Sequence, residues 1–371
     1  MKPALTLAIA ALGGGLFYLI HFPLPWMLGA MAATTLGALL KLQLGVPPRL
    51  RNPTMIVLGL MLGSGFTPDV PGRLLEWWPG LLALAVYLAG AIWVGAFWYR
   101  RKLGCDAPTA YYAAVPGGLS EMVALAMAEK GDEGLVSILH TLRVMVVAAL
   151  VPWGIRLSQG LPLSGTPGSG SLLSLPMTDA GFLALGAVLG ALGGKLLRLP
   201  AYLLVGPMLA SAVISMAGLT SAHPPVELIV IAQVVLGGAV GSRLASVDKA
   251  VVIAAFKASL VLVAPMVAAA AALSWLVSEL AGFDHFAMLL ALMPGGLGEM
   301  TLIALALGID VPFVATHHMM RIALVMLAAP LAFRWMRKRD AKRAAKKIIA
   351  SRGKYKMSRA EILEMRDEGR K

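Results

Sequence analysis

The stretch Pro-Gly-Gly-Leu-Ser-Glu-Met at residues 116–122 returns 178 residues later as Pro-Gly-Gly-Leu-Gly-Glu-Met at residues 294–300. Carried forward without a gap, the same offset matches Asp132 with Asp310, His140 with His318 and Arg143 with Arg321. Self-similarity at a fixed offset indicates an internal duplication. A helix breaker, a carboxylate, an imidazole and a guanidinium therefore occur twice, each time within strongly apolar sequence.

The composition is that of a polytopic membrane protein. The chain is 58% hydrophobic and 14% charged, with a mean hydropathy of +0.79, whereas soluble domains have about 45–50% apolar and about 25% charged residues. Much of the net charge of +13 lies in residues 334–371, which hold 15 Lys/Arg and 5 Asp/Glu. This tail favours a cytoplasmic location and contact with anionic lipid, and we expect no nucleic-acid partner. The single cysteine, Cys105, excludes an intramolecular disulfide.

The apolar segments form two sets of six, separated by a linker rich in Gly, Ser and Pro. We predict an all-α fold with a membrane repeat at residues 1–156, the linker at 157–178, a second repeat at 179–334, and a basic tail with a short helix at 335–371. The predicted apolar segments are 4–20, 24–41, 53–66, 78–99, 109–128, 134–155, 180–197, 201–218, 227–244, 250–279, 285–306 and 312–333.

The positions of Lys and Arg discriminate between two topologies, because positive residues in short loops favour the cytoplasm. Twelve full crossings would leave four basic residues outside, namely Lys195, Arg198, Arg243 and Lys249. Five crossings plus one re-entrant or broken Pro-Gly-Gly helix in each half would misplace only Arg156. We therefore predict two inverted repeats with both termini in the cytoplasm, a plan that recurs among secondary transporters.

Two arginines lie near the centres of apolar segments, where a charge costs about 2.5–3.5 kcal/mol and marks a functional candidate. Each follows a histidine by three residues, so His140 and Arg143 share one helix face, as do His318 and Arg321. A guanidinium suits carboxylate recognition, and a histidine can titrate near neutral pH. We assign the arginines to substrate binding and the histidines to proton or ion coupling. A salt bridge from the arginines to the motif glutamates is the structural alternative.

The motif supplies the other candidates. Because proline and glycine interrupt a helix, Glu121 and Glu299 are expected in the first turn of a half-helix, as proton carriers, fixed countercharges or cation ligands. The free amides at the same helix start suit an anionic substrate. The candidate substrate-binding residues there are Gly117, Gly118, Ser120, Gly295 and Gly296. We expect the aspartates that follow the motif to be helix N-caps.

Two further patterns predict packing. Glycines four residues apart, Gly59 with Gly63 and Gly237 with Gly241, let helix backbones approach closely in lipid. Aromatic residues at segment ends are expected to anchor the helices in the membrane interface. They are Trp77, Trp78, Trp98, Tyr99 and Trp335. The sequence contains no metal-binding His-x-His or His-Glu-x-x-His spacing and no phosphate loop, so we expect neither an enzyme nor a metal or cofactor.

The duplicated motif, the following His-x-x-Arg and the downstream prolines Pro152 and Pro330 resemble the membrane AbrB family over nearly the whole chain, up to about Arg334. The resemblance implies a duplicated membrane domain. The family is similar in plan to the sodium/proton antiporters and bile-acid symporters, which have inverted five-helix repeats and interrupted helices, although the antiporters' paired aspartates are absent here. Labels attached to the family include ammonia monooxygenase and regulator of gene expression. Carrying over the motif positions selects the same glutamates, histidines and arginines.

We therefore expect a secondary active transporter in the inner membrane of a bacterium. It would carry a small organic anion or amino acid, coupled to protons, at a site between the two repeats. A membrane-bound oxidoreductase and a membrane-associated regulator are the alternatives. Bound copper or iron would favour the first, and a requirement for residues 340–371 would favour the second. Gly-rich helices are compatible with a homodimer.

Overall fold

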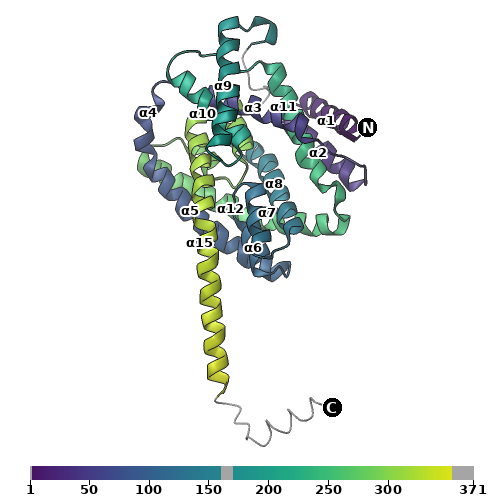
Figure 1. Ribbon diagram of the computed structural model, residues 1–371, viewed down its shortest axis with the longest axis vertical. Coiled ribbons are helices and arrows are strands. Elements are labelled where there is room, and N and C mark those ends of the chain that lie inside the picture. Colours follow the sequence, from purple (N-terminus) through teal and green to yellow (C-terminus); the bar gives the residue numbers. More distant parts are fainter. Residues whose placement is uncertain (1, 160–169, 353–371) are drawn as a thin grey trace, which may run out of the picture. The chain divides into compact units, whose positions relative to one another are not determined.

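The computed structural model describes residues 2–159 and 170–352, and within these ranges every regular element is a helix (Figure 1). The chain divides into two compact units, Met1–Met326 and Leu327–Lys371. The described part of the second unit is the continuation of α15 (Val311–Arg352). The short helix predicted in the basic tail lies outside the described residues, as does much of the predicted linker.

The first half contains α1 (Lys2–Leu19), α2 (Pro25–Leu39), α3 (Pro48–Gly63), α4 (Val70–Arg73), η1 (Leu74–Trp77), α5 (Trp78–Lys102), α6 (Ala107–Ala114), α7 (Leu119–Ala128) and α8 (Glu133–Gln159). The second half contains η2 (Leu172–Ser174), α9 (Met177–Leu196), α10 (Tyr202–Met216), α11 (Val226–Ser242), η3 (Arg243–Ser246), α12 (Lys249–Ala281), α13 (His285–Leu292), α14 (Leu297–Ala306) and α15.

The backbone of the second half repeats that of the first. Helices α6, α7 and α8 begin 178 residues before α13, α14 and α15. Left-handed φ angles, which are uncommon outside glycine, recur at the same offset of 177 or 178. The pairs are His21 and Arg198, Leu24 and Ala201, Lys41 and Gly218, Gly104 and Gly282, and Lys130 and Gly308. The turns are thus duplicated together with the motif.

Within residues 2–159 and 170–352, seven helices are long and apolar enough to cross a membrane: α1, α5, α8, α9, α11, α12 and α15. Three further predicted crossings, α2, α3 and α10, have only 15 or 16 residues. They span about 23 Å at 1.5 Å per residue, less than a bilayer core of about 30 Å. These short helices are packed on their neighbours rather than isolated, because α2 contacts α1 and α11, and α10 contacts α3 and α9.

The glycine pairs lie where helices of different halves cross, since α3 packs on α10 and α2 on α11. A Cβ atom at Gly63 would overlap the backbone carbonyl oxygen of Met208, and one at Gly241 would lie 2.5 Å from that of Met31. Only glycine permits such close approach of two backbones. The predicted packing role of these glycines is confirmed, and each half contributes a helix to the core of the other.

Helices α5 and α12 are equivalent in the two halves and run antiparallel. The Tyr87 hydroxyl donates a hydrogen bond to the carbonyl of Met266 (3.2 Å), and the Trp98 indole N–H donates to the carbonyl of Ala258 (3.3 Å). Residue numbers rise along α5 while the partner numbers fall along α12.

Each Pro-Gly-Gly stretch breaks a helix into two short ones. Val115, after α6, and Gly118, before α7, are both extended. The two ends of the first broken segment meet, because the Asp132 amide donates to the Thr109 hydroxyl (2.7 Å). At the second, the rings of Phe283 and Phe313 are 5.2 Å apart. The start and the finish of each broken segment therefore lie next to each other.

The two aspartates that follow the motif are N-caps, as predicted. Asp132 accepts a hydrogen bond from the Leu135 amide (2.9 Å), and Asp310 accepts one from the Phe313 amide (3.0 Å). The predicted aromatic anchors are only partly correct. Trp78 and Trp335 are exposed, but Trp77 is buried against the Phe313 ring at 5.3 Å. The short helices α4 and η1 turn Trp77 inward onto α15. This burial was not predicted, because Trp77 stands at the end of an apolar segment. Tyr99 is also buried.

Candidate functional site

The two buried arginines cap the C-terminal ends of the broken helices. Arg321 on α15 donates from Nη1 to the carbonyl of Met293 (2.8 Å) and from Nη2 to that of Gly295 (2.6 Å). Arg143 on α8 donates in the same way to three successive carbonyls at the end of α6, those of Ala113, Ala114 and Val115, at 3.0, 3.0 and 3.3 Å. The Pro-Gly-Gly stretch interrupts the helical hydrogen bonding at these carbonyls, and the guanidinium donates to them in its place, although the Val115 carbonyl also accepts from the Gly117 amide (3.0 Å).

The guanidinium groups are almost fully enclosed, with 2% of Arg143 and 3% of Arg321 exposed. A helix C-terminus carries about −0.5 of an elementary charge, so the carbonyls balance part of each arginine. In the described residues neither arginine forms an ion pair with Glu121 or Glu299. The expected alternative of a direct salt bridge is therefore not what holds the arginines.

The histidines one turn earlier are buried and oriented. His140 Nε2 lies 2.9 Å from the carbonyl of Val115, and His318 Nε2 lies 2.9 Å from that of Leu290. A carbonyl only accepts, so Nε2 carries the hydrogen in both rings. Among the described residues, both Nδ1 atoms are buried and have no hydrogen-bond partner. A ring whose Nδ1 carries no hydrogen can accept a proton or a hydrogen bond there.

The motif glutamates fold back onto their own helix starts. Glu121 and Glu299 lie in the first turns of α7 and α14, as predicted. Each carboxylate occupies the place that a Cβ atom would take on the N-cap glycine, Gly118 or Gly296. A carboxylate there is favoured by the positive end of the helix dipole. The helix start that was expected to hold a substrate is thus filled by a side chain, and Ser120 beside it is exposed.

Each broken segment contacts the helix that carries the arginine of the other half, because the first break packs on α15 and α14 packs on α8. A Cβ atom at Gly117, in the first break, would lie 2.9 Å from Cγ1 of Val325, one turn beyond Arg321 on α15. Both broken segments also contact α5, the first through α6 and the second through α13.

Sequence reasoning missed two polar residues of the core. Tyr87 is buried on the apolar helix α5, where its hydroxyl donates to the Met266 carbonyl, and nothing in the pattern of α5 distinguishes it from a packing residue. Gln233 on α11 is fully buried, and within the described residues its amide nitrogen and oxygen both lack hydrogen-bond partners. A lone glutamine inside the apolar run of residues 228–240 was a signal that could have been noticed. Within the described ranges, no three His, Cys, Asp or Glu side chains gather as a metal site would require.

Comparison with known proteins yields one family model and two relatives that each cover most of the chain. The family model described as "Transition state regulatory protein AbrB" matches residues 26–337. "Uncharacterized protein YhjN" of Bacillus subtilis (strain 168) is 26% identical over 363 residues, covering 90% of this chain and 93% of that protein. "Putative regulator AbrB" of Escherichia coli (strain K12) is 27% identical over 335 residues, covering 89% of this chain and 94% of that protein.

Proposed function

The chain belongs to the AbrB family, and from its two arginine-capped helix breaks we propose that it is a secondary active transporter of the inner membrane. Its substrate would be a small organic anion or amino acid, moved together with protons. The observation that carries the proposal is that each arginine-capped break packs on the helix that bears the other half's arginine.

The proposal requires inverted repeats, and the contacts along α5 support them. Trp77, where α5 begins, packs on Phe313 at the start of α15. The other end of α5 leads into α6, whose Thr109 meets Asp132 at the start of α8. Because α5 has 25 residues and is about 37 Å long, α8 and α15 start at opposite ends of it. Equivalent helices would then cross the membrane in opposite directions.

The positive residues orient this arrangement. The C-terminal end of α5 carries Arg100, Arg101 and Lys102, which assigns that end to the cytoplasm. The start of α8 then lies on the cytoplasmic side and the start of α15 on the external side. In inverted-repeat transporters the substrate site lies where interrupted helices meet near the midplane, and here that region contains Arg143 and Arg321.

A charge balance at each break suggests how protons would couple to an anion. The arginine (+1) faces a helix C-terminus (about −0.5), and the glutamate (−1) covers a helix N-terminus (about +0.5). The break is near neutral while the glutamate is ionised and gains one positive charge when it is protonated. A substrate carboxylate would take the amides that the protonated glutamate releases, so anion and proton binding would favour each other.

Transport in proteoliposomes tests the proposal. Purified protein is assayed against a panel of monocarboxylates, dicarboxylates and amino acids, with and without an inward proton gradient. We expect gradient-stimulated uptake of at least one anion, loss of that uptake in R321Q, and loss of the stimulation in E299Q. The matched control is E133Q, at an exposed carboxylate in the first turn of α8. Absence of uptake of every compound by folded protein would refute the proposal.

A further inference from the structure

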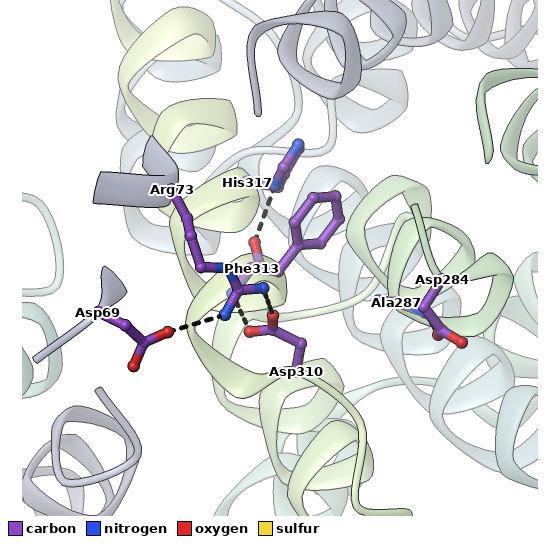
Figure 2. Close-up of polar contacts among 7 residues, drawn as sticks. All are labelled: Asp69, Arg73, Asp284, Ala287, Asp310, Phe313 and His317. Atoms are coloured by element: carbon purple, nitrogen blue, oxygen red, sulfur yellow. Dashed lines mark hydrogen bonds and ion pairs between the residues drawn. The ribbon is translucent and has the colours of Figure 1, made fainter. Parts of the chain in front are cut away.

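The two broken hairpins differ at their outer ends, and one of them is tied to the opposite half. Asp310, the N-cap of α15, forms an ion pair with Arg73 of α4 (Figure 2). Arg73 also reaches Asp69 at 3.4 Å. At the equivalent place in the first half, Asp132 caps α8, but the residue that corresponds to Arg73 at the offset of 178 is Val251. The tie therefore exists at one end of the molecule and has no counterpart built from equivalent residues at the other.

The two oxygens of Asp310 have separate tasks. Oδ1 accepts the hydrogen bond from the Phe313 amide that caps α15, while Oδ2 binds Arg73. Breaking the ion pair would leave the cap in place, so α4 could separate from α15 without unwinding the helix. The pair is partly exposed, with 42% of the Arg73 side chain and 25% of the Asp310 side chain accessible. Pairs of this kind contribute little to stability, which suits a contact that must open.

An aromatic cluster lies directly behind the ion pair. The guanidinium carbon of Arg73 is 5.7 Å from the centre of the Trp77 ring, and Trp77 packs on Phe313. The ring of His317 lies 4.1 Å from that of Phe313 and is fully buried, with Nδ1 2.8 Å from the Phe313 carbonyl. A Cβ atom at Gly80 of α5 would lie 2.5 Å from His317 Nε2, so glycine there lets α5 close over the ring. Figure 2 shows His317 one turn beyond the capped start of α15.

We propose that Arg73 and Asp310 form a latch that closes the external side of the transport path, with Trp77, Phe313 and His317 as the plug beneath it. This inference rests on the proposed function, because a latch on one side of the membrane is meaningful only if a transport path connects the two sides. It also gives a role to His317, whose first-half equivalent is Leu139 and which a symmetric pair of proton-carrying histidines leaves unexplained. The structure then corresponds to a state sealed on the outside.

Hydrogen–deuterium exchange of the full-length protein in nanodiscs tests the latch without requiring a substrate. D310N keeps an oxygen that can cap α15 but removes the charge, and R73Q removes the partner. Each should speed exchange of peptides spanning 311–320 about two- to fivefold, the range expected for a partly exposed ion pair. The double variant should be no faster than either single variant, because both remove one interaction. D132N is the matched control, since it changes an equivalent cap that lacks an arginine, and it should leave exchange in 311–320 unchanged.

Side-specific labelling gives the second readout. In an H317C variant that also carries C105S, a membrane-impermeant maleimide added from outside should react faster when D310N is present, again about two- to fivefold. Unchanged exchange and unchanged labelling in D310N, or additive effects of R73Q and D310N, would overturn the latch. Faster labelling in a protein that transports nothing would support the latch and refute the proposed transport. Transport activity together with unaltered labelling would refute the latch and support the proposed transport.

Discussion

Replacing Gly296 by alanine tests the placement of the Glu299 carboxylate, on which the coupling scheme depends. The φ and ψ angles of Gly296, −77° and 154°, are open to alanine, so the backbone itself is not strained. The new Cβ atom would instead take the position of the carboxylate. Losing a carboxylate from a helix N-terminus costs about 0.3–2 kcal/mol depending on burial, and alanine is also a poorer N-cap than glycine. We expect G296A to lose about 1–2 kcal/mol and to show weaker proton stimulation of transport.

Gly298 provides the control two residues later. An added Cβ there meets no atom within 4 Å, and alanine favours a helix over glycine by up to about 1 kcal/mol. The two variants should therefore shift the thermal-unfolding midpoint in one detergent in opposite directions. A double-mutant cycle of G296A with E299A isolates the contact, because G296A should lose most of its cost once the carboxylate is gone. Equal shifts in G296A and G298A, or a coupling energy near zero, would refute the placement of the carboxylate.

Three other predictions concern packing, capping and pH. G63A should lower the yield of folded protein and destabilise it by about 1–3 kcal/mol or more because its Cβ overlaps the Met208 carbonyl, while G90A, in open space on α5, should raise stability by up to about 1 kcal/mol in the same thermal assay. R321Q should lower the free energy of unfolding by about 3–6 kcal/mol, because it removes two charged hydrogen bonds to the Met293 and Gly295 carbonyls, and R321K should recover part of the loss. Equal stability of R321Q and wild type would contradict the capping role. Burial lowers the pKa of His223, which contacts the Ser64 hydroxyl at 2.6 Å, so the neutral form is favoured in the folded state. The free energy of unfolding should therefore fall as the pH drops below about 6.5. H223Q should flatten this pH dependence in thermal unfolding, and an unchanged profile would contradict the prediction.

The sequence was informative at positions where a residue type is energetically unfavourable in an apolar helix unless it has a specific partner. A charge within an apolar helix and a glycine at fixed spacing each need a partner, so Arg143, Arg321, Gly63 and Gly241 were identified correctly as special positions. What bound the arginines was not predictable, because the acceptors are backbone carbonyls, and a sequence does not indicate which carbonyls a break leaves without partners. The glutamates were expected to lie in a first turn, but their folding back over the N-cap glycine depends on a rotamer.

The asymmetric features were the least predictable. Comparing residues 178 positions apart identifies those that the two halves share, but it does not identify residues that only one half has. Arg73 lies outside the duplicated motif, and its pairing with Asp310 joins positions 237 residues apart. Trp77 was expected to anchor its helix in the membrane interface because it stands at a segment end, whereas α4 and η1 bring it next to Arg73 of the ion pair. Tertiary contacts of this kind are set by how helices turn between spans, and composition carries little information about it.

The orientation of the two hairpins is the central claim, and cysteine labelling from the two sides of the membrane tests it most directly. Lys130 and His285 are exposed residues at the ends of the first and second broken segments. In a C105S background, K130C should react with a membrane-impermeant maleimide only from the cytoplasmic side, and H285C only from the external side. Labelling of both positions from the same side would contradict inverted repeats, and with them the site between the two breaks.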